Sequence, residues 1–232
     1  MLIHSCSSYR LLRKGLLSLL LTLCFAGTVI ASHNLAGEIT YNYLGNNQIE
    51  INLATYTDPS AYGVDRCEID LEIWNQAGTV KIADLPNIRR VNGPYQNDPI
   101  FPNLSCPNAY MGEYIFGTVK KNLYTTNYTF NGPGFYLIRF YDHARLANIK
   151  NIYDSGLQTF FLETTVFINN FLGPENSPRF LNHPLDFACV DKVWTHNPGG
   201  WDPDNGDSLV YTLVPCRQYD PPSIPSPIPS TG

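Results

Sequence analysis

The chain has 232 residues, of which only 15% are charged, and it is rich in Tyr, Phe, Gly and Pro. This length suffices for one large domain or two small ones, and the composition favours short strands joined by turns over long amphipathic helices. Residues 1–31 contain three basic residues and no acidic one, so the remainder has 12 basic and 20 acidic residues, a net charge of −8. An acidic chain without a Lys/Arg cluster argues against binding to nucleic acid or to anionic membranes.

The first 31 residues have the three parts of a secretory signal peptide. Arg10, Arg13 and Lys14 form a basic region, an apolar run follows, and the small-residue site Val29-Ile30-Ala31 predicts cleavage at its end. A transmembrane anchor is one alternative, but the apolar run is short for a span. A lipoprotein signal is another, but the residue before Cys24 is bulky for that site. The sequence therefore predicts an exported protein, secreted or on the outer cell surface, with no membrane span after signal cleavage.

Residues 32–172 are predicted to form a β-sandwich domain. Eight segments are predicted to be strands: 38–44, 48–56, 68–74, 79–83, 110–119, 124–130, 135–141 and 159–168. The first three alternate polar and apolar residues, and the last is an apolar, β-branched and aromatic run. Turn-forming residues separate several of these segments, and Gly45-Asn46-Asn47 between the first two is typical of a hairpin. Only residues 144–152 have a helical tendency. Eight or so short strands separated by turns favour an all-β sandwich.

Residues 173–219 are predicted to begin a second, immunoglobulin-like sandwich module. Candidate strands cover residues 179–182, 186–190, 193–196 and 208–214. A complete immunoglobulin-like sandwich needs about seven strands, so the sequence predicts a partial module in a fragment of a longer protein. Residues 220–232 are rich in Pro and are predicted to be an extended, unpacked tail or linker.

An acidic turn inside the second segment suggests a calcium site. Ca²⁺ takes six to eight hard oxygen ligands, and the turn concentrates carboxylates beside a glycine. The EF-hand pattern does not fit, because Leu213 stands where that loop needs a glutamate. We expect instead a junction site whose ligands come from the linker and the turn: Glu175, Asn176, Asp202, Asp204, Asn205 and Asp207. The alternative is a solvated turn whose Asp and Asn side chains cap their own backbone.

Four cysteines remain after the predicted signal peptide: Cys67, Cys106, Cys189 and Cys216. An even number of cysteines in an exported chain suggests disulfides, and four cysteines allow three pairings. Their spacing favours one bridge in each domain, Cys67–Cys106 and Cys189–Cys216.

The sequence shows no convincing set of catalytic residues: it has no G-x-S-x-G motif, no H-E-x-x-H motif and no Cys/His pairing. Asp142-His143 comes nearest to an acid–base pair, but no nucleophile motif accompanies it, and an ion pair or a turn at a strand end explains it better. We therefore predict no enzyme, with a secreted hydrolase as the weakest hypothesis. Most aromatic residues alternate within strands and are expected in the core. Trp201, next to Gly199-Gly200, is the aromatic residue that we expect to contact a ligand such as a polysaccharide.

With these motifs identified, the chain resembles the large cell-surface proteins of Bacteroidetes that are associated with gliding motility. The resemblance covers residues 32 to about 216 and lies in the order of six motifs: Ser32–Tyr41, Glu50–Leu53, Asn148–Ile152, Asn176–Phe180, Ala188–Val190 and Asp202–Tyr211. One departure is Asp142-His143, which stands where these relatives have a cysteine pair.

The resemblance implies an exported multidomain protein whose second module is PKD-like or cadherin-like. It implies surface location and adhesion more than a chemical activity, with other surface proteins or extracellular polysaccharide as partners. The leading prediction is therefore a structural or adhesion protein with a calcium-stiffened interdomain junction. The alternative is a carbohydrate-binding module attached to a larger secreted enzyme.

Overall fold

The computed structural model describes residues 34–58, 65–92, 112–115, 119–143, 145–169, 171, 173–184, 189, 191–204, 207–220 and 225–228. Within these ranges every regular element is a β-strand except the short 3₁₀ helix η1 (Ser155–Leu157). The prediction of an all-β, sandwich-like fold is therefore confirmed. The predicted signal peptide, residues 1–31, lies outside the described residues.

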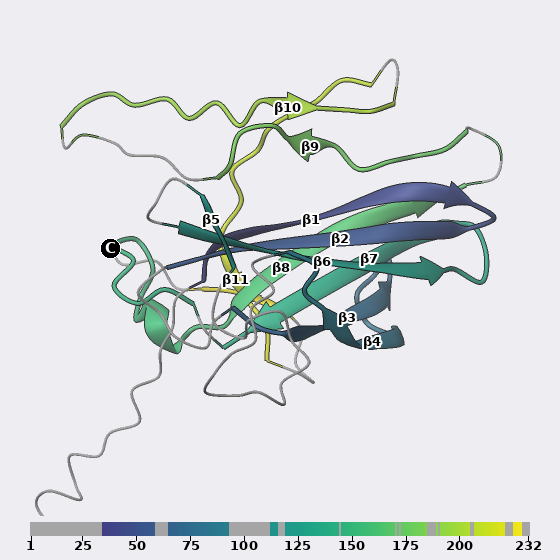
Figure 1. Ribbon diagram of the computed structural model, residues 1–232, viewed down its shortest axis with the longest axis horizontal. Helices are drawn as coiled ribbons and strands as arrows, with labels where there is room; N and C mark the ends of the chain where they lie inside the picture. The colour runs from purple at the N-terminus through teal and green to yellow at the C-terminus, as the bar shows by residue number, and fades with distance from the viewer. Residues whose placement is uncertain are drawn as a thin grey trace, which may run out of the picture. The chain divides into compact units, whose positions relative to one another are not determined.

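Sheet A contains four antiparallel strands in the order β1-β2-β6-β5 (Figure 1). Its strands are β1 (Asn34–Gly45), β2 (Gln48–Thr57), β6 (Val119–Thr129) and β5 (Glu113–Ile115). The turn between β1 and β2 places Asn46 and Asn47 at positive φ, 52° and 59°. Asn tolerates this left-handed conformation, and two such residues give the turn the twist of the flanking strands. The hairpin predicted from the sequence is thus confirmed, with its turn at the expected residues.

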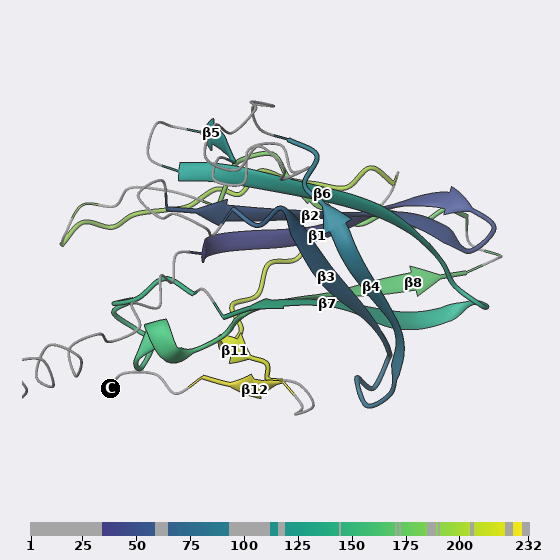
Figure 2. The same cartoon turned by 60° about the horizontal axis from the view of Figure 1, so that its bottom comes forward.

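Sheet B contains four long strands, also antiparallel, in the order β4-β3-β7-β8. Its strands are β3 (Glu68–Asn75), β4 (Lys81–Arg89), β7 (Gly134–Asp142) and β8 (Phe160–Ile168). Figure 2 shows β7 and β8 in a layer beside the layer of β1, β2 and β6. The two sheets thus form the sandwich.

The hydrophobic core lies between the two sheets. Ile51 and Leu53 from sheet A and Ile73, Ile138 and Val166 from sheet B have 0% exposure. Each alternates along its strand with a residue of the opposite face, as the period of two in the sequence requires. Burying a side chain of this size contributes about 1.5–3 kcal/mol to the free energy of unfolding. The apolar residues on the inner faces of the strands therefore stabilise the packing of the two sheets.

Two details of the predicted strands differ from the structure. The segment predicted as 110–119 contains the three-residue strand β5, and β6 begins at Val119 instead of residue 124. The helical tendency of residues 144–152 is not realised in the described residues, where 145–152 form a bridge and turns. This segment has no continuous apolar face to bury, and a short isolated helix is marginal without one.

The chain after β8 lies on both outer faces of the sandwich. The strands β9 (Arg179–Phe180) and β10 (Gly200–Trp201) form a small ribbon beside sheet A (Figure 1). The strands β11 (Arg217–Gln218) and β12 (Ser226–Pro227) form a second ribbon beside sheet B (Figure 2). Residues 31–232 group into one compact unit, and the domain boundary at residue 172 stays a prediction.

Several local predictions for this last stretch are wrong. No strand forms over 193–196 or 208–214, because no neighbouring strand supplies hydrogen-bond partners there. The side chains of Val193 and Leu213 in these segments are fully exposed. Most of the segment 186–190 lies outside the described residues. The tail was expected to be unpacked, yet Ile228 is buried and its N–H donates to the carbonyl of Cys216 at 2.9 Å.

Candidate functional site

The residues predicted at the junction begin a segment that is bonded to the edge strand of sheet A. We call residues 175–204 the strap. The N–H of Tyr41 donates to Oγ of Ser177 at 2.8 Å, and the N–H of Ser177 donates to the carbonyl of Tyr41 at 3.0 Å. The N–H of Tyr43 donates to Oδ1 of Asn176 at 2.8 Å. These bonds satisfy donors on the open side of β1, which would otherwise be an unpaired sheet edge.

The two ends of the strap meet at Asn176 and Asp204. The backbone N–H of Asn176 donates to Oδ2 of Asp204 at 2.6 Å, and Nδ2 of Asn176 donates to Oδ1 at 2.7 Å. Asp202 accepts a hydrogen bond from the N–H of Asp204 at 2.9 Å, which is the local capping expected of an Asp in a turn. The structure therefore brings the linker and the acidic turn together, as the junction hypothesis requires.

Negative charge accumulates where they meet. The pKa of Glu175 is raised, first because the carboxyl is partly desolvated and then because Asp207, Asp204 and Asp202 repel its negative form. The pKa of Tyr41 is raised to about 12, first because the hydroxyl is buried and then because Glu175, Asp204 and Asp202 repel its negative form. A cation placed here would reduce this repulsion.

The arrangement does not form a ready-made metal site. Both carboxylate oxygens of Asp204 accept hydrogen bonds from Asn176, and Oδ1 of Asn176 accepts one from Tyr43. Among the residues that the structure describes, no group of three or more His, Cys, Asp or Glu side chains is placed to hold a metal ion. Asn205, another predicted ligand, lies outside them. The carboxylates of Glu175, Asp202, Asp204 and Asp207 therefore include no set of three that is placed to bind a cation.

Trp201 lies on the ribbon, where its backbone pairs with Arg179, and its side chain is 48% exposed. The neighbouring Gly200 has no room for a side chain, because a Cβ there would overlap the hydroxyl of Tyr211. Tyr211 in turn stacks on Phe180 with the ring centroids 6.5 Å apart. The predicted contact residue thus lies on a surface with two more exposed aromatic rings.

A groove lies between the ribbon and the outer face of sheet A. Its volume is about 170 Å³, and three strands of the sheet together with β9 form its walls. The lining residues are Glu38, Thr40, Asn52, Ala54, Lys121, Leu123, Arg179 and Phe180. Arg179 also hydrogen-bonds to Asn42 of β1, which fixes the ribbon over the sheet. A site with charged, polar and aromatic walls is suited to a polar ligand that also presents an apolar face.

The groove was not predicted from the sequence. Its polar residues are outward positions of β1, β2 and β6, and they meet only because Thr40 pairs with Asn52 and Leu53 pairs with Tyr124. The alternation of each strand shows which residues face outward, but the register between distant strands cannot be read from it.

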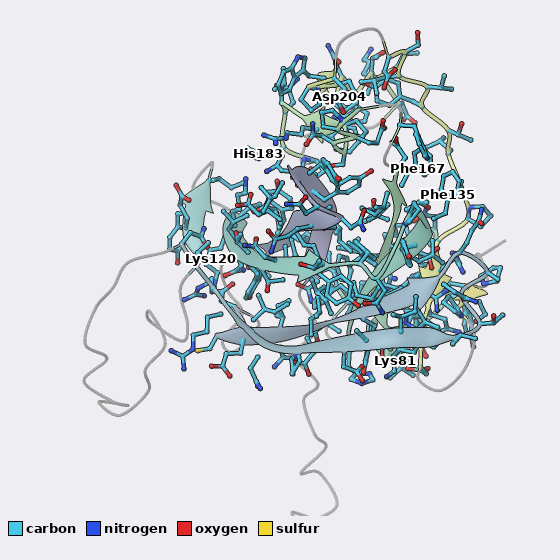
Figure 3. The ribbon with its side chains drawn as sticks, turned by 90° about the vertical axis from the view of Figure 1, so that its right-hand side faces the viewer. Lys81, Lys120, Phe135, Phe167, His183 and Asp204 are labelled. Atoms are coloured by element: carbon cyan, nitrogen blue, oxygen red, sulfur yellow. The ribbon has the colours of Figure 1, made fainter. Side chains whose placement is uncertain are left out.

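His183 gives a further contact between the strap and sheet A. Its Nδ1 lies 3.3 Å from the hydroxyl of Tyr56, which donates to Glu38 at 2.9 Å. Tyr56 is fully buried, and Figure 3 shows His183 between the sheet and the part of the strap that holds Asp204. The contacts of His183 with Tyr56 are those of packing and hydrogen bonding.

The cysteines do not follow the predicted pairing at the C-terminal end. Cys189 and Cys216 are free and exposed, so the predicted Cys189–Cys216 bridge is absent. Cys189 belongs to the strap, whereas Cys216 directly precedes β11. Cys67 is disulfide-bonded, and Cys106, its predicted partner, lies outside the described residues.

Asp142 forms the ion pair that was expected at the end of its strand. Both of its carboxylate oxygens accept hydrogen bonds from the guanidinium of Arg66, at 3.0 and 3.1 Å. The contact raises the pKa of Arg66. The ring of His143 lies 6.2 Å from that of Tyr141. Asp142 therefore joins the segment before β3 to the end of β7.

Comparison with known proteins gives no family assignment. No model of a known protein family matches the chain, and neither the curated proteins nor the solved structures contain a match. Across the described ranges, no helix has the length and apolar character needed to cross a bilayer.

Proposed function

We propose that this chain is an exported cell-surface protein with a structural or adhesive role and no enzymatic activity, of the gliding-motility-associated kind that its motifs resemble. The observation that carries the proposal is the closure of the strap by Asn176 and Asp204 on the edge of sheet A. This closure fixes the chain after the sandwich at one defined place on it. A protein that transmits or resists force at a surface benefits from such a rigid connection.

Calcium would strengthen this connection. In the proposal, Ca²⁺ draws the carboxylates of Glu175, Asp202 and Asp207 into one site, although they are not grouped for a metal ion without it, and water and backbone carbonyls complete its oxygen ligands. The support is the raised pKa of Glu175, which is caused first by partial desolvation and then by repulsion from Asp207, Asp204 and Asp202. The Cys67–Cys106 disulfide belongs to the same proposal, as a restraint on the exported domain.

The calcium proposal is tested by thermal unfolding of the purified protein with Ca²⁺ and with chelator. A site filled at a hundred times its Kd adds roughly 2.7 kcal/mol to the free energy of unfolding. The rise in Tm should disappear in Asp202→Asn/Asp207→Asn and persist in Asp84→Asn, a control on β4. Equal Tm values with calcium and with chelator would refute the metal site.

The surface location is tested in the cells that make the protein. The mature protein should begin after Ala31 by N-terminal sequencing, and protease added to intact cells should digest it. Retention of residues 1–31 together with protection from added protease would contradict export. Deletion of the gene should reduce attachment or gliding without loss of a hydrolytic activity in the medium.

A second candidate function, carbohydrate binding, is favoured by the groove between the ribbon and sheet A. Phe180 is 47% exposed and supplies an aromatic face, while Asn52, Lys121 and Arg179 supply hydrogen-bond donors. The protein should then be retarded on polysaccharide columns, and Phe180→Ala or Trp201→Ala should abolish the retardation. Trp194→Ala is the matched control, because Trp194 is similarly exposed at 44% but stacks on His196 away from the lining residues.

A further inference from the structure

A buried cluster of charged and polar side chains lies at one end of the sandwich core, centred on Asp65 and Lys120. Asp65 precedes β3, and Lys120, which is labelled in Figure 3, lies near the start of β6. Lys120 shares its face of β6 with Tyr124, a core residue, so its side chain points between the sheets. The side chains of Asp65 and Lys120 are 0% and 2% exposed. Such complete burial of a lysine and a carboxylate is costly and calls for a specific explanation.

The two oxygens of Asp65 have different partners. Oδ2 lies 2.5 Å from Nζ of Lys120 and accepts a second hydrogen bond from the N–H of Gly112 at 3.1 Å. Oδ1 accepts hydrogen bonds from Oγ1 of Thr57 at 2.6 Å and from Nδ2 of Asn122 at 2.9 Å. One oxygen therefore faces the amine, and the other is held by two uncharged donors.

Arg90 fixes the orientation of one of these donors. Its Nη1 donates to Oδ1 of Asn122 at 3.0 Å and to the backbone carbonyl of Asp65 at 3.3 Å. With its oxygen engaged by Arg90, the amide of Asn122 turns its NH₂ group toward Asp65. The donors around Oδ1 are thus held in place by the fold before any reaction occurs.

We propose that Lys120 and Asp65 condense to form an intramolecular isopeptide bond. Transfer of one proton across their contact gives an uncharged amine and a carboxylic acid. The Nζ lone pair then attacks Cγ of Asp65, and the electrons of the carbonyl bond move to Oδ1. Collapse of this intermediate breaks the Cγ–Oδ2 bond, and Oδ2 leaves as water with two protons that Nζ originally carried. The ion pair thereby becomes an amide plus one water, and no oxidant or other reactant is consumed.

The geometry supplies the three things that this reaction needs. The nucleophile and the carboxyl are held in contact, and well-oriented intramolecular groups react with effective molarities of about 10⁵–10⁸ M. Thr57 and Asn122 stabilise the charge that develops on Oδ1, in the manner of an oxyanion hole. Burial keeps bulk water away from the amide that forms.

The bond would join the two sheets covalently. Lys120 belongs to sheet A, and Asp65 is two residues before Cys67 and three before the first residue of β3 in sheet B. Separation of the sheets would then require breaking a covalent bond. The inference rests on the Asp65 cluster alone and does not depend on the groove or on calcium.

Peptide mapping by mass spectrometry tests the proposal directly on the full chain. After reduction, alkylation and trypsin digestion, we expect residues 91–121 to be linked to the peptide that ends at Arg66. The linked species should be lighter than the sum of the two peptides by the mass of one water molecule, and trypsin should not cleave after Lys120. Cleavage after Lys120 together with a free peptide ending at Arg66 would overturn the proposal.

Two lysine variants test whether Lys120 supplies the nitrogen of the isopeptide bond. Lys120→Arg keeps a buried cation beside Asp65 but removes the amine, so the linked species should be absent. Lys121→Arg changes the next residue of the same strand, whose side chain lines the groove on the opposite face, and it should leave the linked species unchanged. A linked species that persists in Lys120→Arg would also overturn the assignment, because another group would then supply the nitrogen.

Discussion

Asn176 holds the carboxylate of Asp204 with two hydrogen bonds, one from its backbone N–H at 2.6 Å and one from Nδ2 at 2.7 Å. The two residues are 28 positions apart, and their contact closes the strap into a loop whose base is bonded to β1. This pair explains why a turn so rich in acidic residues lies against the sheet. A carboxylate that accepts two well-aligned bonds anchors the turn even without a metal ion.

Removal of the Asp204 carboxylate should therefore destabilise the strap. We expect Asp204→Ala to lower the free energy of unfolding by about 2 kcal/mol, because the donors of Asn176 lose a charged partner in a partly buried site. Urea unfolding measures the loss. Asp207→Ala is the control, since Asp207 is exposed, and its change should stay within about 0.5 kcal/mol. Equal losses in the two variants would contradict an anchoring role for Asp204.

Tyr219 should hold the C-terminal ribbon on sheet B. It is 1% exposed, its hydroxyl donates to Glu72 at 2.9 Å, and its ring meets those of Trp74, Tyr141 and Phe161. We expect Tyr219→Ala to cost on the order of 3 kcal/mol, the lower end for loss of a buried aromatic ring.

Tyr219→Ala should also make the C-terminal ribbon more accessible to protease. Limited trypsin digestion should cleave Tyr219→Ala after Arg217 faster than the parent protein. Tyr153→Ala removes a tyrosine that is 60% exposed and should change neither quantity. If the two variants behaved alike, Tyr219 would not be the residue that holds the ribbon.

The sandwich was predictable because its strands bury one face and expose the other. In β2, the apolar residues Ile49, Ile51 and Leu53 alternate with polar ones, and the structure buries all three completely. This pattern depends only on neighbouring positions in the sequence, so it can be read without knowing the fold. The same holds for the Asn46-Asn47 turn.

The ribbons and the buried cluster were not predictable in this way. β9 and β10 have two residues each, too few to show any alternation, and their place is set by contacts such as that of Arg179 with Asn42. Lys120 looks like a surface residue in the sequence, because its partner Asp65 is 55 positions away. The one local sign is its spacing of four from the buried Tyr124, which places both on the same face of one strand.

The acidic junction should make stability depend on pH in a particular direction. The folded pKa of Glu175 is raised above its ordinary value of 4.5 by partial desolvation and by Asp207, Asp204 and Asp202. The stabilisation linked to its protonated form is therefore complete below pH 4.5 and is lost as the pH rises through the folded pKa.

Glu175→Gln removes this dependence. Its Tm should exceed that of the parent protein at pH 7, and the difference should vanish below pH 4.5. Glu113→Gln, at an exposed carboxyl on β5, serves as the control and should show no such crossover. A Glu175→Gln variant that is less stable than the parent at pH 7 would show that the carboxylate is not under net repulsion.

The free thiols give a further test of how the C-terminal stretch lies on the sandwich. Because Cys189 and Cys216 are free and exposed, iodoacetamide should label both in the native protein without reductant. Cys67 should become labelled only after reduction and unfolding, since it is disulfide-bonded. Mass spectrometry of the labelled peptides distinguishes the three sites, and Cys189→Ser should leave Cys216 fully reactive. Protection of both thiols until a reductant is added would instead indicate the Cys189–Cys216 bridge, and with it a path of the chain that brings the two ribbons together.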